Sequence, residues 1–169
     1  MKNFVITAAL NSEFPFKDEF PVIYTGAGKT NATLNLCSYL NSHPQTQLVI
    51  NVGSAGGITE RIGSVIECGI FIDGQLDYPG YIEEHIVYQA SKKICLTFDN
   101  FITKTPEKIG NCVDMEAFSL AKTCSRMGVN FLCFKYISDI IGENNQENKW
   151  LENHKSGKDL LKEIIKNTV

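Results

Sequence analysis

Short apolar runs and amphipathic stretches follow one another along the chain, and this pattern predicts strands and helices in turn. The runs are continuous, which is typical of strands buried on both faces of a sheet. They cover residues 3–9, 22–26, 47–53, 64–72, 85–90, 93–99 and 130–139. Helical spacing of apolar residues predicts helices over 29–40, 116–127 and 157–167. Buried strands that alternate with helices indicate an α/β domain with a central, largely parallel sheet.

Polar residues stand directly after several of the predicted strands. In open α/β sheets the ligand usually lies beyond the carboxyl ends of the strands, so these residues are the first candidates for a site. They are Glu13, residues 53–57 with a predicted glycine-rich turn over 54–57, residues 99–101 and 114–116, and Ser138 with Asp139.

The composition is that of a globular protein, with 43% hydrophobic and 21% charged residues. This balance excludes disordered and collagen-like chains and predicts a single domain over residues 1–169. The formal charge is −3, from 16 basic and 19 acidic residues, which gives no electrostatic reason to expect nucleic acid or anionic lipid as a partner. No apolar run approaches the roughly 18 residues of a membrane span, so we expect a cytoplasmic protein without a membrane partner.

Six cysteines are spread along the chain without a CxxC pair, mostly between apolar neighbours. This spacing favours free thiols packed in the core over disulfides or a zinc site, and we expect neither a metal nor a cofactor. They are Cys37, Cys68, Cys95, Cys112, Cys124 and Cys133.

The segment GAGKT at residues 26–30 follows a predicted strand and opens a predicted helix, as a phosphate-binding loop does. Such a loop needs a further glycine five positions before Gly28, where this chain has Ile23. The segment is therefore interpreted as a tight turn from strand to helix.

Three carboxylates stand at three predicted strand ends. Glu116 opens a helix and Asp139 ends a strand, so a favourable helix dipole or a helix cap explains each of them singly. Together with Glu13, and beside the glycine-rich segment, they favour a site over three separate structural roles.

Five segments together resemble one family. They are ITAALNSE (6–13), NVGSAGG (51–57), FDNFI (98–102), VDMEA (113–117) and YISD (136–139). Their order and strand-end placement resemble the purine nucleoside phosphorylase and nucleosidase superfamily, and most of all its hydrolytic branch, the methylthioadenosine/S-adenosylhomocysteine nucleosidases. The resemblance implies a three-layer phosphorylase/hydrolase-like α/β fold, with a mixed, largely parallel sheet flanked by helices. It also implies a shortened member, with segments reduced before Tyr24 and between Ile72 and Ile94.

The resemblance implies hydrolysis of the N-glycosidic bond of an adenosine-type nucleoside without a cofactor. Asp139, with Ser138 in the same motif, would direct a proton at purine N7, which requires a raised pKa. Glu13 would activate water on the other side of the sugar, as in inverting glycosidases. Glu116 would accept hydrogen bonds from the ribose hydroxyls.

The remaining residues implied by the resemblance would bind the base and the sugar. Met115 would line the apolar face of the sugar, Phe101 would stack on adenine, and Ile102 would offer backbone hydrogen bonds to its edge. The wall near ribose and base would be formed by Ser54, Ala55 and Gly56.

Two substrate-binding positions depart from the family pattern. Ala27 stands where relatives often have a larger apolar residue, which would leave room near the 5′ side of the sugar. Lys135 stands where many hydrolytic relatives have arginine, and a lysine keeps the charge without the planar fork.

Two alternatives remain open, a phosphorylase and a non-catalytic nucleoside-binding homologue. A phosphorylase must bind phosphate, and arginine side chains suit this because the guanidinium group can donate two parallel hydrogen bonds to phosphate oxygens. The chain has only Arg61 and Arg126, and Asn51 stands where trimeric-type phosphorylases place a phosphate-binding arginine. Hydrolysis is therefore favoured, and a homodimer is expected from the resemblance.

Overall fold

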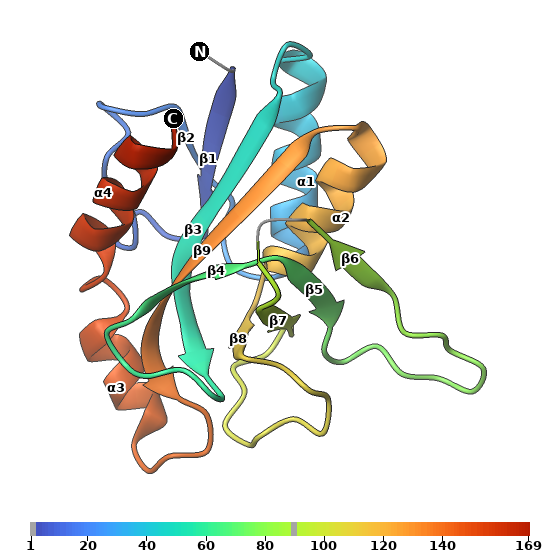
Figure 1. Cartoon of the computed structure of the whole chain (residues 1–169), viewed down its shortest axis with the longest axis vertical. Helices are drawn as coiled ribbons and strands as arrows, with labels where there is room; N and C mark the ends of the chain where they lie inside the picture. The colour runs from blue at the N-terminus through green and yellow to red at the C-terminus, as the bar shows by residue number, and fades with distance from the viewer. Residues whose placement is uncertain (1–2, 89–90) are drawn as a thin grey trace.

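The computed structural model describes residues 3–88 and 91–169, and these contain nine strands and four helices (Figure 1). The strands are β1 (Phe4–Ala8), β2 (Val22–Tyr24), β3 (Leu48–Gly57), β4 (Val65–Cys68), β5 (Ile70–Asp73), β6 (His85–Val87), β7 (Ile94–Thr97), β8 (Cys112–Asp114) and β9 (Asn130–Ile140). The helices are α1 (Lys29–Ser42), α2 (Ala117–Met127), α3 (Gln146–Asn153) and α4 (Lys158–Thr168).

The strands form one mixed sheet in the order β2-β1-β3-β8-β7-β5-β6, and β9 pairs with both β3 and β4. The pairs β1–β2, β1–β3, β3–β9, β5–β7 and β7–β8 are parallel. The pairs β3–β8, β4–β9 and β5–β6 are antiparallel. The predicted fold class, an α/β fold around a mixed, largely parallel sheet, is confirmed.

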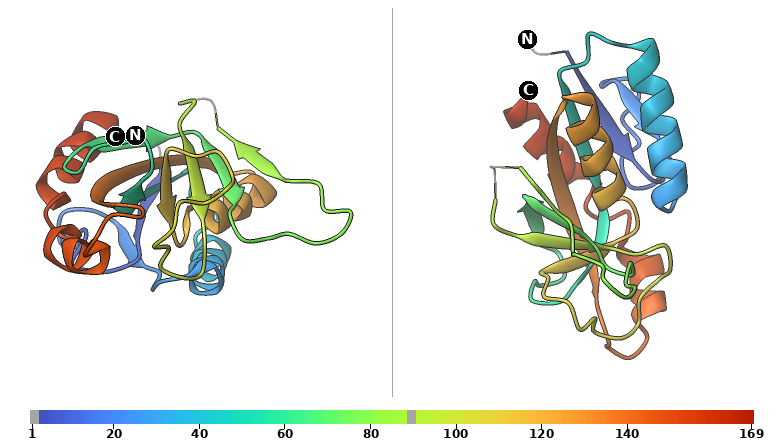
Figure 2. Two further views of the ribbon diagram at one scale, coloured as in Figure 1. Left: turned by 90° about the horizontal axis from the view of Figure 1, so that it is seen from below. Right: turned by 90° about the vertical axis from the view of Figure 1, so that its right-hand side faces the viewer.

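Helices cover both faces of the long strands β3 and β9. On one face α1 and α2 pack through Leu36 and Leu120, while on the other α4 packs through Leu161 and Ile165 (Figure 2). Leu160, between the α4 residues Asp159 and Leu161, does not join this packing, because its side chain is 52% exposed. The two clusters fix the positions of β3 and β9, whose carboxyl ends carry candidate residues.

The glycine-rich segment over 54–57 is strand and not turn, because β3 continues through it beside β9 with a bulge between Ala55 and Gly56. The glycines serve close packing. A Cβ at Gly56 would lie 2.4 Å from Cδ1 of Ile141, and one at Gly57 would lie 2.7 Å from the carbonyl oxygen of Glu60.

The predicted strand over 64–72 is two strands, β4 and β5, separated at Gly69. A Cβ at Gly69 would lie 1.9 Å from the carbonyl oxygen of Ser91, so another segment crosses at this point. The strand predicted over 85–90 is observed over 85–87, and residues 89 and 90 lie outside the described residues. Helix α3 and the short strand β8 were not predicted.

None of the helices described in residues 3–88 and 91–169 is both long and apolar enough to cross a membrane.

Candidate active site

A cavity of about 170 Å³ lies where β3 and β9 end, and α3 forms part of its wall. The residues predicted from the sequence that line it are Glu13, Ala27, Ser54, Ala55, Gly56, Phe101, Ile102, Met115, Glu116 and Asp139. They come from loops after β1, β2 and β7, from β3 and β9, and from the junction of β8 with α2. The fold therefore brings ten of the twelve predicted residues together; Ser138 and Lys135 do not line this cavity.

The carboxylate of Glu13 is held by hydrogen bonds at the cavity wall. Its Oε1 accepts from the backbone N–H of Ser54 at 2.8 Å and from the Ser54 hydroxyl at 2.6 Å. Its Oε2 accepts from the backbone N–H of Leu10 at 3.2 Å. The side chain also covers Gly53, where a Cβ would lie 3.4 Å from Oε1. These contacts orient a carboxylate that is only 5% exposed.

Asp139 lies near the end of β9 with both carboxyl oxygens in hydrogen bonds. The hydroxyl of Ser138 donates to Oδ1 at 2.6 Å, and the Gln146 amide donates to Oδ2 at 2.8 Å. Burial raises the pKa of Asp139 above its ordinary value, while these two hydrogen bonds act in the opposite direction. Asp139 therefore keeps its proton to a higher pH than a solvated aspartate. Ser138 is buried and contacts two residues of the cavity wall, since its hydroxyl also lies 3.4 Å from the carbonyl oxygen of Ala55.

Glu116 precedes α2, and its Oε1 accepts the backbone N–H of Gly28 at 2.9 Å. Burial, with the nearby Asp114 carboxylate, raises the pKa of Glu116 to about 8. Lys135 and the Gly28 N–H oppose this rise. Around neutral pH a large part of Glu116 is therefore protonated before a ligand binds.

Lys135, which was expected to bind substrate, does not line the cavity but lies behind its wall. Its ammonium lies 2.8 Å from Oδ2 of Asp114, and the side chain is 1% exposed. Asp114 also accepts from the Thr97 hydroxyl at 2.6 Å and from the backbone N–H of Ala117 at 2.8 Å. Burial acts against ionisation of Asp114, but Lys135 and these donors hold its pKa below the ordinary value. Lys135 thus supports the cavity through Asp114, which does line it.

Gln146 and Trp150 of α3 line the cavity and were missed by the sequence analysis. Besides Asp139, Gln146 donates to the carbonyl of Ile102 at 2.8 Å. The indole N–H of Trp150 donates to the Ser54 hydroxyl at 3.2 Å, and the Trp150 ring lies edge-on to that of Phe101 at 6.0 Å. Their spacing of four residues on one helix face was the available signal, but α3 has no apolar stripe that would predict the helix.

The comparison with family models identifies the superfamily. The model described as "Phosphorylase superfamily" matches residues 83–169, which is just over half of the chain. The chain belongs to the phosphorylase superfamily.

Three nucleosidases are similar to this member of the phosphorylase superfamily. The 5′-methylthioadenosine/S-adenosylhomocysteine nucleosidase of Geobacillus kaustophilus is 25% identical over 164 residues, covering 75% of this chain and 69% of the relative. The Helicobacter pylori nucleosidase of that name, solved with butyl-thio-DADMe-Immucillin-A, has a TM-score of 0.86 at 17% identity over 99% of both chains. The Colwellia psychrerythraea nucleosidase, solved with adenine, has a TM-score of 0.77 at 19% identity over 90% of this chain and 88% of its own.

In this member of the superfamily, the described residues that line the cavity include no lysine, arginine or histidine. They include four carboxylic residues, namely Glu13, Asp114, Glu116 and Asp139. Arg61 and Arg126 are both exposed and belong to other parts of the molecule. The cavity is therefore suited to a neutral or cationic group and is a poor host for a phosphate dianion.

Proposed function

We propose that the protein is a nucleosidase that hydrolyses the N-glycosidic bond of adenosine-type nucleosides, such as 5′-methylthioadenosine or S-adenosylhomocysteine. The products are adenine and the free ribose derivative. The observation that carries the proposal is the convergence of Glu13, Glu116 and Asp139 on one cavity. The likeness to the Geobacillus kaustophilus nucleosidase supports the choice of substrate class.

Asp139 is the proposed general acid. Departure of adenine leaves negative charge on the base, and a proton delivered to N7 neutralises it. The raised pKa of Asp139 supports this role because the acid must hold its proton before the bond breaks. Ser138 and Gln146 each donate a hydrogen bond to one of the two carboxyl oxygens. These bonds hold the carboxyl group in one orientation, so it is already positioned for proton transfer.

Glu13 is the proposed base, which takes a proton from the water that attacks C1′. Its carboxylate is already oriented by Ser54 and Leu10, and the Ser54 hydroxyl is in turn bound by Trp150. An acid on the leaving group and a base for water is the division of roles in inverting glycosidases.

Glu116 is the proposed partner of the ribose hydroxyls. The sugar gains positive charge as the bond lengthens, so an ionised carboxylate binds the transition state more tightly than the ground state. Hydroxyl donors that bind Glu116 favour its anion, which counteracts the rise of its pKa in the free protein. Met115 would supply apolar contact to the sugar, and Phe101 and Ile102 would contact the base.

Hydrolysis is preferred over phosphorolysis because of the charge of the cavity. The described residues that line the cavity include carboxylates and no cationic side chain, so they would repel an incoming phosphate. A non-catalytic nucleoside-binding protein would not need carboxylates at both the base and the water position. The homodimer, the single domain and the cytoplasmic location stay predictions from the sequence.

The test is release of the free base from methylthioadenosine, S-adenosylhomocysteine, adenosine and inosine, each with and without phosphate; the base is adenine from the first three and hypoxanthine from inosine. We expect adenine from the 5′-substituted substrates without phosphate, and loss of turnover in Asp139→Asn. Asp159→Asn is the matched control, since Asp159 is exposed on α4.

Dependence of base release on added phosphate would establish the phosphorylase alternative. Full turnover by Asp139→Asn would remove Asp139 from the mechanism. Adenine binding in a thermal-shift assay, with no turnover of any substrate, would support the non-catalytic homologue.

A further inference from the structure

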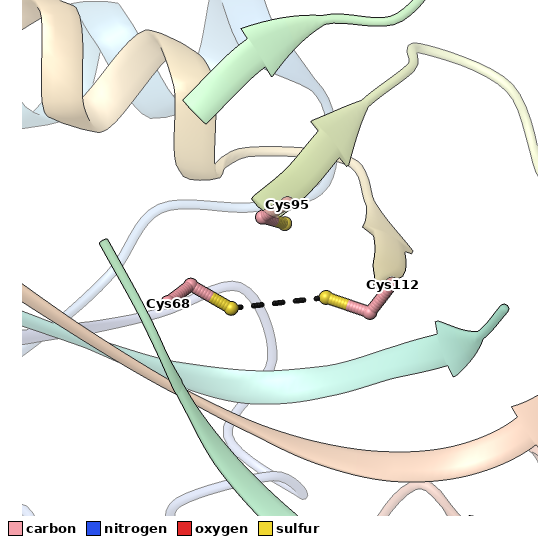
Figure 3. Close-up of side chains that lie close together, drawn as sticks. All are labelled: Cys68, Cys95 and Cys112. Atoms are coloured by element: carbon pink, nitrogen blue, oxygen red, sulfur yellow. Dashed lines mark hydrogen bonds between the residues drawn. The ribbon is translucent and has the colours of Figure 1, made fainter. Parts of the chain in front are cut away.

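Three cysteines that lie far apart in the sequence meet inside the sheet, and none of them lines the candidate active site. The sulfur atoms of Cys68, Cys95 and Cys112 all lie within 4.8 Å of one another, and those of Cys68 and Cys112 are 3.8 Å apart (Figure 3). The three side chains are 2%, 0% and 0% exposed. No sequence motif joins them, because the topology alone brings β4, β7 and β8 to this point.

The strand register explains the meeting. Cys95 and Cys112 are direct neighbours in the parallel ladder of β7 and β8. Cys68 belongs to β4, which pairs with β9 and comes from the other part of the sheet. The cluster therefore connects the β7–β8 pair with the β4–β9 pair, although in the described part of the chain neither strand of one pair is hydrogen-bonded to a strand of the other.

We propose that Cys68, Cys95 and Cys112 form a three-coordinate thiolate site for one Cu(I) ion. In an equilateral triangle of sulfur atoms with sides between 3.8 and 4.8 Å, the centre lies about 2.2–2.8 Å from each atom. Metal–thiolate bonds of about 2.3 Å fall inside that range. The sulfur atoms thus already surround a position at bonding distance, without a change of backbone register.

The donor set selects a soft cation. All three donors are sulfur, and the neighbours in the core cluster are apolar, so magnesium and calcium, which prefer oxygen, are excluded. Zinc in structural sites takes four ligands. Cys133 is the nearest candidate for a fourth, since it lies opposite Cys68 in the ladder. Its thiol contacts that of Cys68 and is also placed to donate to Oδ1 of Asn51 at 3.4 Å, but it does not lie within 4.8 Å of all three sulfur atoms and is not part of the three-sulfur group.

Charge and access are compatible with this ion. Each thiol that binds as thiolate releases one proton to solvent, so the affinity rises with pH. The Asp114 carboxylate and the Lys135 ammonium both act electrostatically on Cys112, in opposite directions, and the ammonium offsets part of the negative charge. Cys68 lies on β4, a strand of four residues whose one described partner is β9, so opening of this short strand gives the ion a route inward.

The experiment titrates the reduced full chain with Cu(I) under anaerobic conditions, against a chromophoric Cu(I) chelator. We expect one ion per chain, a higher melting temperature and, by X-ray absorption, three sulfur neighbours. Cys95→Ala and Cys112→Ala should each lower the affinity by more than about 100-fold, since even loss of a supporting outer residue costs 10–100-fold. Circular dichroism establishes that each variant is folded.

Matched controls come from cysteines outside the cluster. Cys37→Ala on α1 and Cys124→Ala, buried on α2, should keep the affinity of the wild type. Wild-type affinity in a folded Cys95→Ala or Cys112→Ala variant, or no Cu(I) uptake by the wild type, would overturn the proposal. Tighter binding of Zn(II) than of Cu(I), lost in Cys133→Ala, would overturn the three-coordinate assignment in favour of a four-thiolate site.

Discussion

The side-chain amide of Gln146 donates a 2.8 Å hydrogen bond to Oδ2 of Asp139 and links α3 to the end of β9. The same amide nitrogen donates to the carbonyl of Ile102, and the Gln146 carbonyl oxygen accepts from the backbone N–H of Gly142 at 3.1 Å. Because the amide group is fixed by three contacts, it presents a donor and not an acceptor to Asp139. Gln146 therefore stabilises the anion of the proposed acid and limits the rise of its pKa that burial causes.

Replacement of Gln146 by leucine should raise the pKa of Asp139 further, because burial remains and one donor to the anion is lost. The acid must be protonated, so activity falls as the pH rises through this pKa. In Gln146→Leu the alkaline limb of kcat/KM for adenine release should therefore move to higher pH. Asn153→Leu is the matched control, since the Asn153 amide donates to the carbonyl of Ser138 and not to Asp139. An unchanged alkaline limb in Gln146→Leu would contradict the assignment.

The buried ion pair between Lys135 and Asp114 should dominate the effect of substitutions behind the cavity. Lys135→Met leaves the Asp114 carboxylate buried without its counter-charge, and we expect the free energy of unfolding to fall by about 3–5 kcal/mol. In the double variant Asp114→Asn, Lys135→Met no charge is left uncompensated, so part of this loss should be recovered. Urea unfolding at neutral pH measures both.

The control for this pair is the surface ion pair between Lys162 and Glu19, at 2.5 Å, whose side chains are 19% and 49% exposed. Lys162→Met should change the free energy of unfolding by less than about 1 kcal/mol. The pKa of Asp114 is lowered in the folded protein, so its contribution to stability is present above its ordinary pKa of 3.8 and is lost as the pH falls through the lowered value. Equal losses in Lys135→Met and Lys162→Met would show that burial of the pair has no special effect.

Gly56 should not tolerate a side chain. A Cβ there would lie 2.4 Å from Cδ1 of Ile141 and 3.1 Å from Oδ2 of Asp139. We expect Gly56→Ala to lower the free energy of unfolding by about 1–3 kcal/mol and to reduce turnover by displacing Asp139. The double variant Gly56→Ala, Ile141→Val removes the closer contact, so it should regain stability without full turnover. If the double variant recovers both stability and turnover, the contact with Ile141 alone explains the effect of Gly56→Ala.

The positions of most cavity residues could be predicted because they depend on one rule of α/β sheets. Ligand sites lie beyond the carboxyl ends of strands, and Glu13, Ser54, Glu116 and Asp139 are each polar residues at or near such an end. The long apolar run of β9 made the position of Asp139 predictable from the sequence. The resemblance to nucleosidases then added apolar residues such as Phe101, which no polarity pattern would select.

The errors arise where tertiary contacts override the local pattern. Residues 54–57 were interpreted as a turn because of their glycines, but neighbouring side chains and backbone require glycine within the strand. Gln146 is the one buried residue of α3, so the hydrophobic pattern gave no sign of that helix. Lys135 was expected at the substrate because it stands where many hydrolytic relatives of the resembled family have arginine. Its partner Asp114, 21 positions earlier in the sequence, explains its burial instead.

Ionisation of Glu116 should lower the stability of the folded protein as the pH rises. Its pKa is raised from 4.5 to about 8 on folding, so the unfolded chain loses this proton at lower pH than the folded chain does. The contribution of Glu116 to stability is therefore complete below pH 4.5, falls as the pH rises, and is lost above about 8. A shift of this size corresponds to as much as roughly 5 kcal/mol.

Glu116→Gln removes this titration but keeps an oxygen that can accept the Gly28 N–H. The variant should gain stability relative to the wild type between pH 4.5 and about 8, and the gap should stay constant at higher pH. Its turnover should fall, because a neutral amide does not stabilise positive charge on the ribose. Urea unfolding across this pH range measures the gap, with Glu147→Gln as control because Glu147 is exposed on α3. If the Glu116→Gln and wild-type curves run parallel across the range, Glu116 is ionised in the folded protein as easily as in water, and burial does not tune this carboxylate.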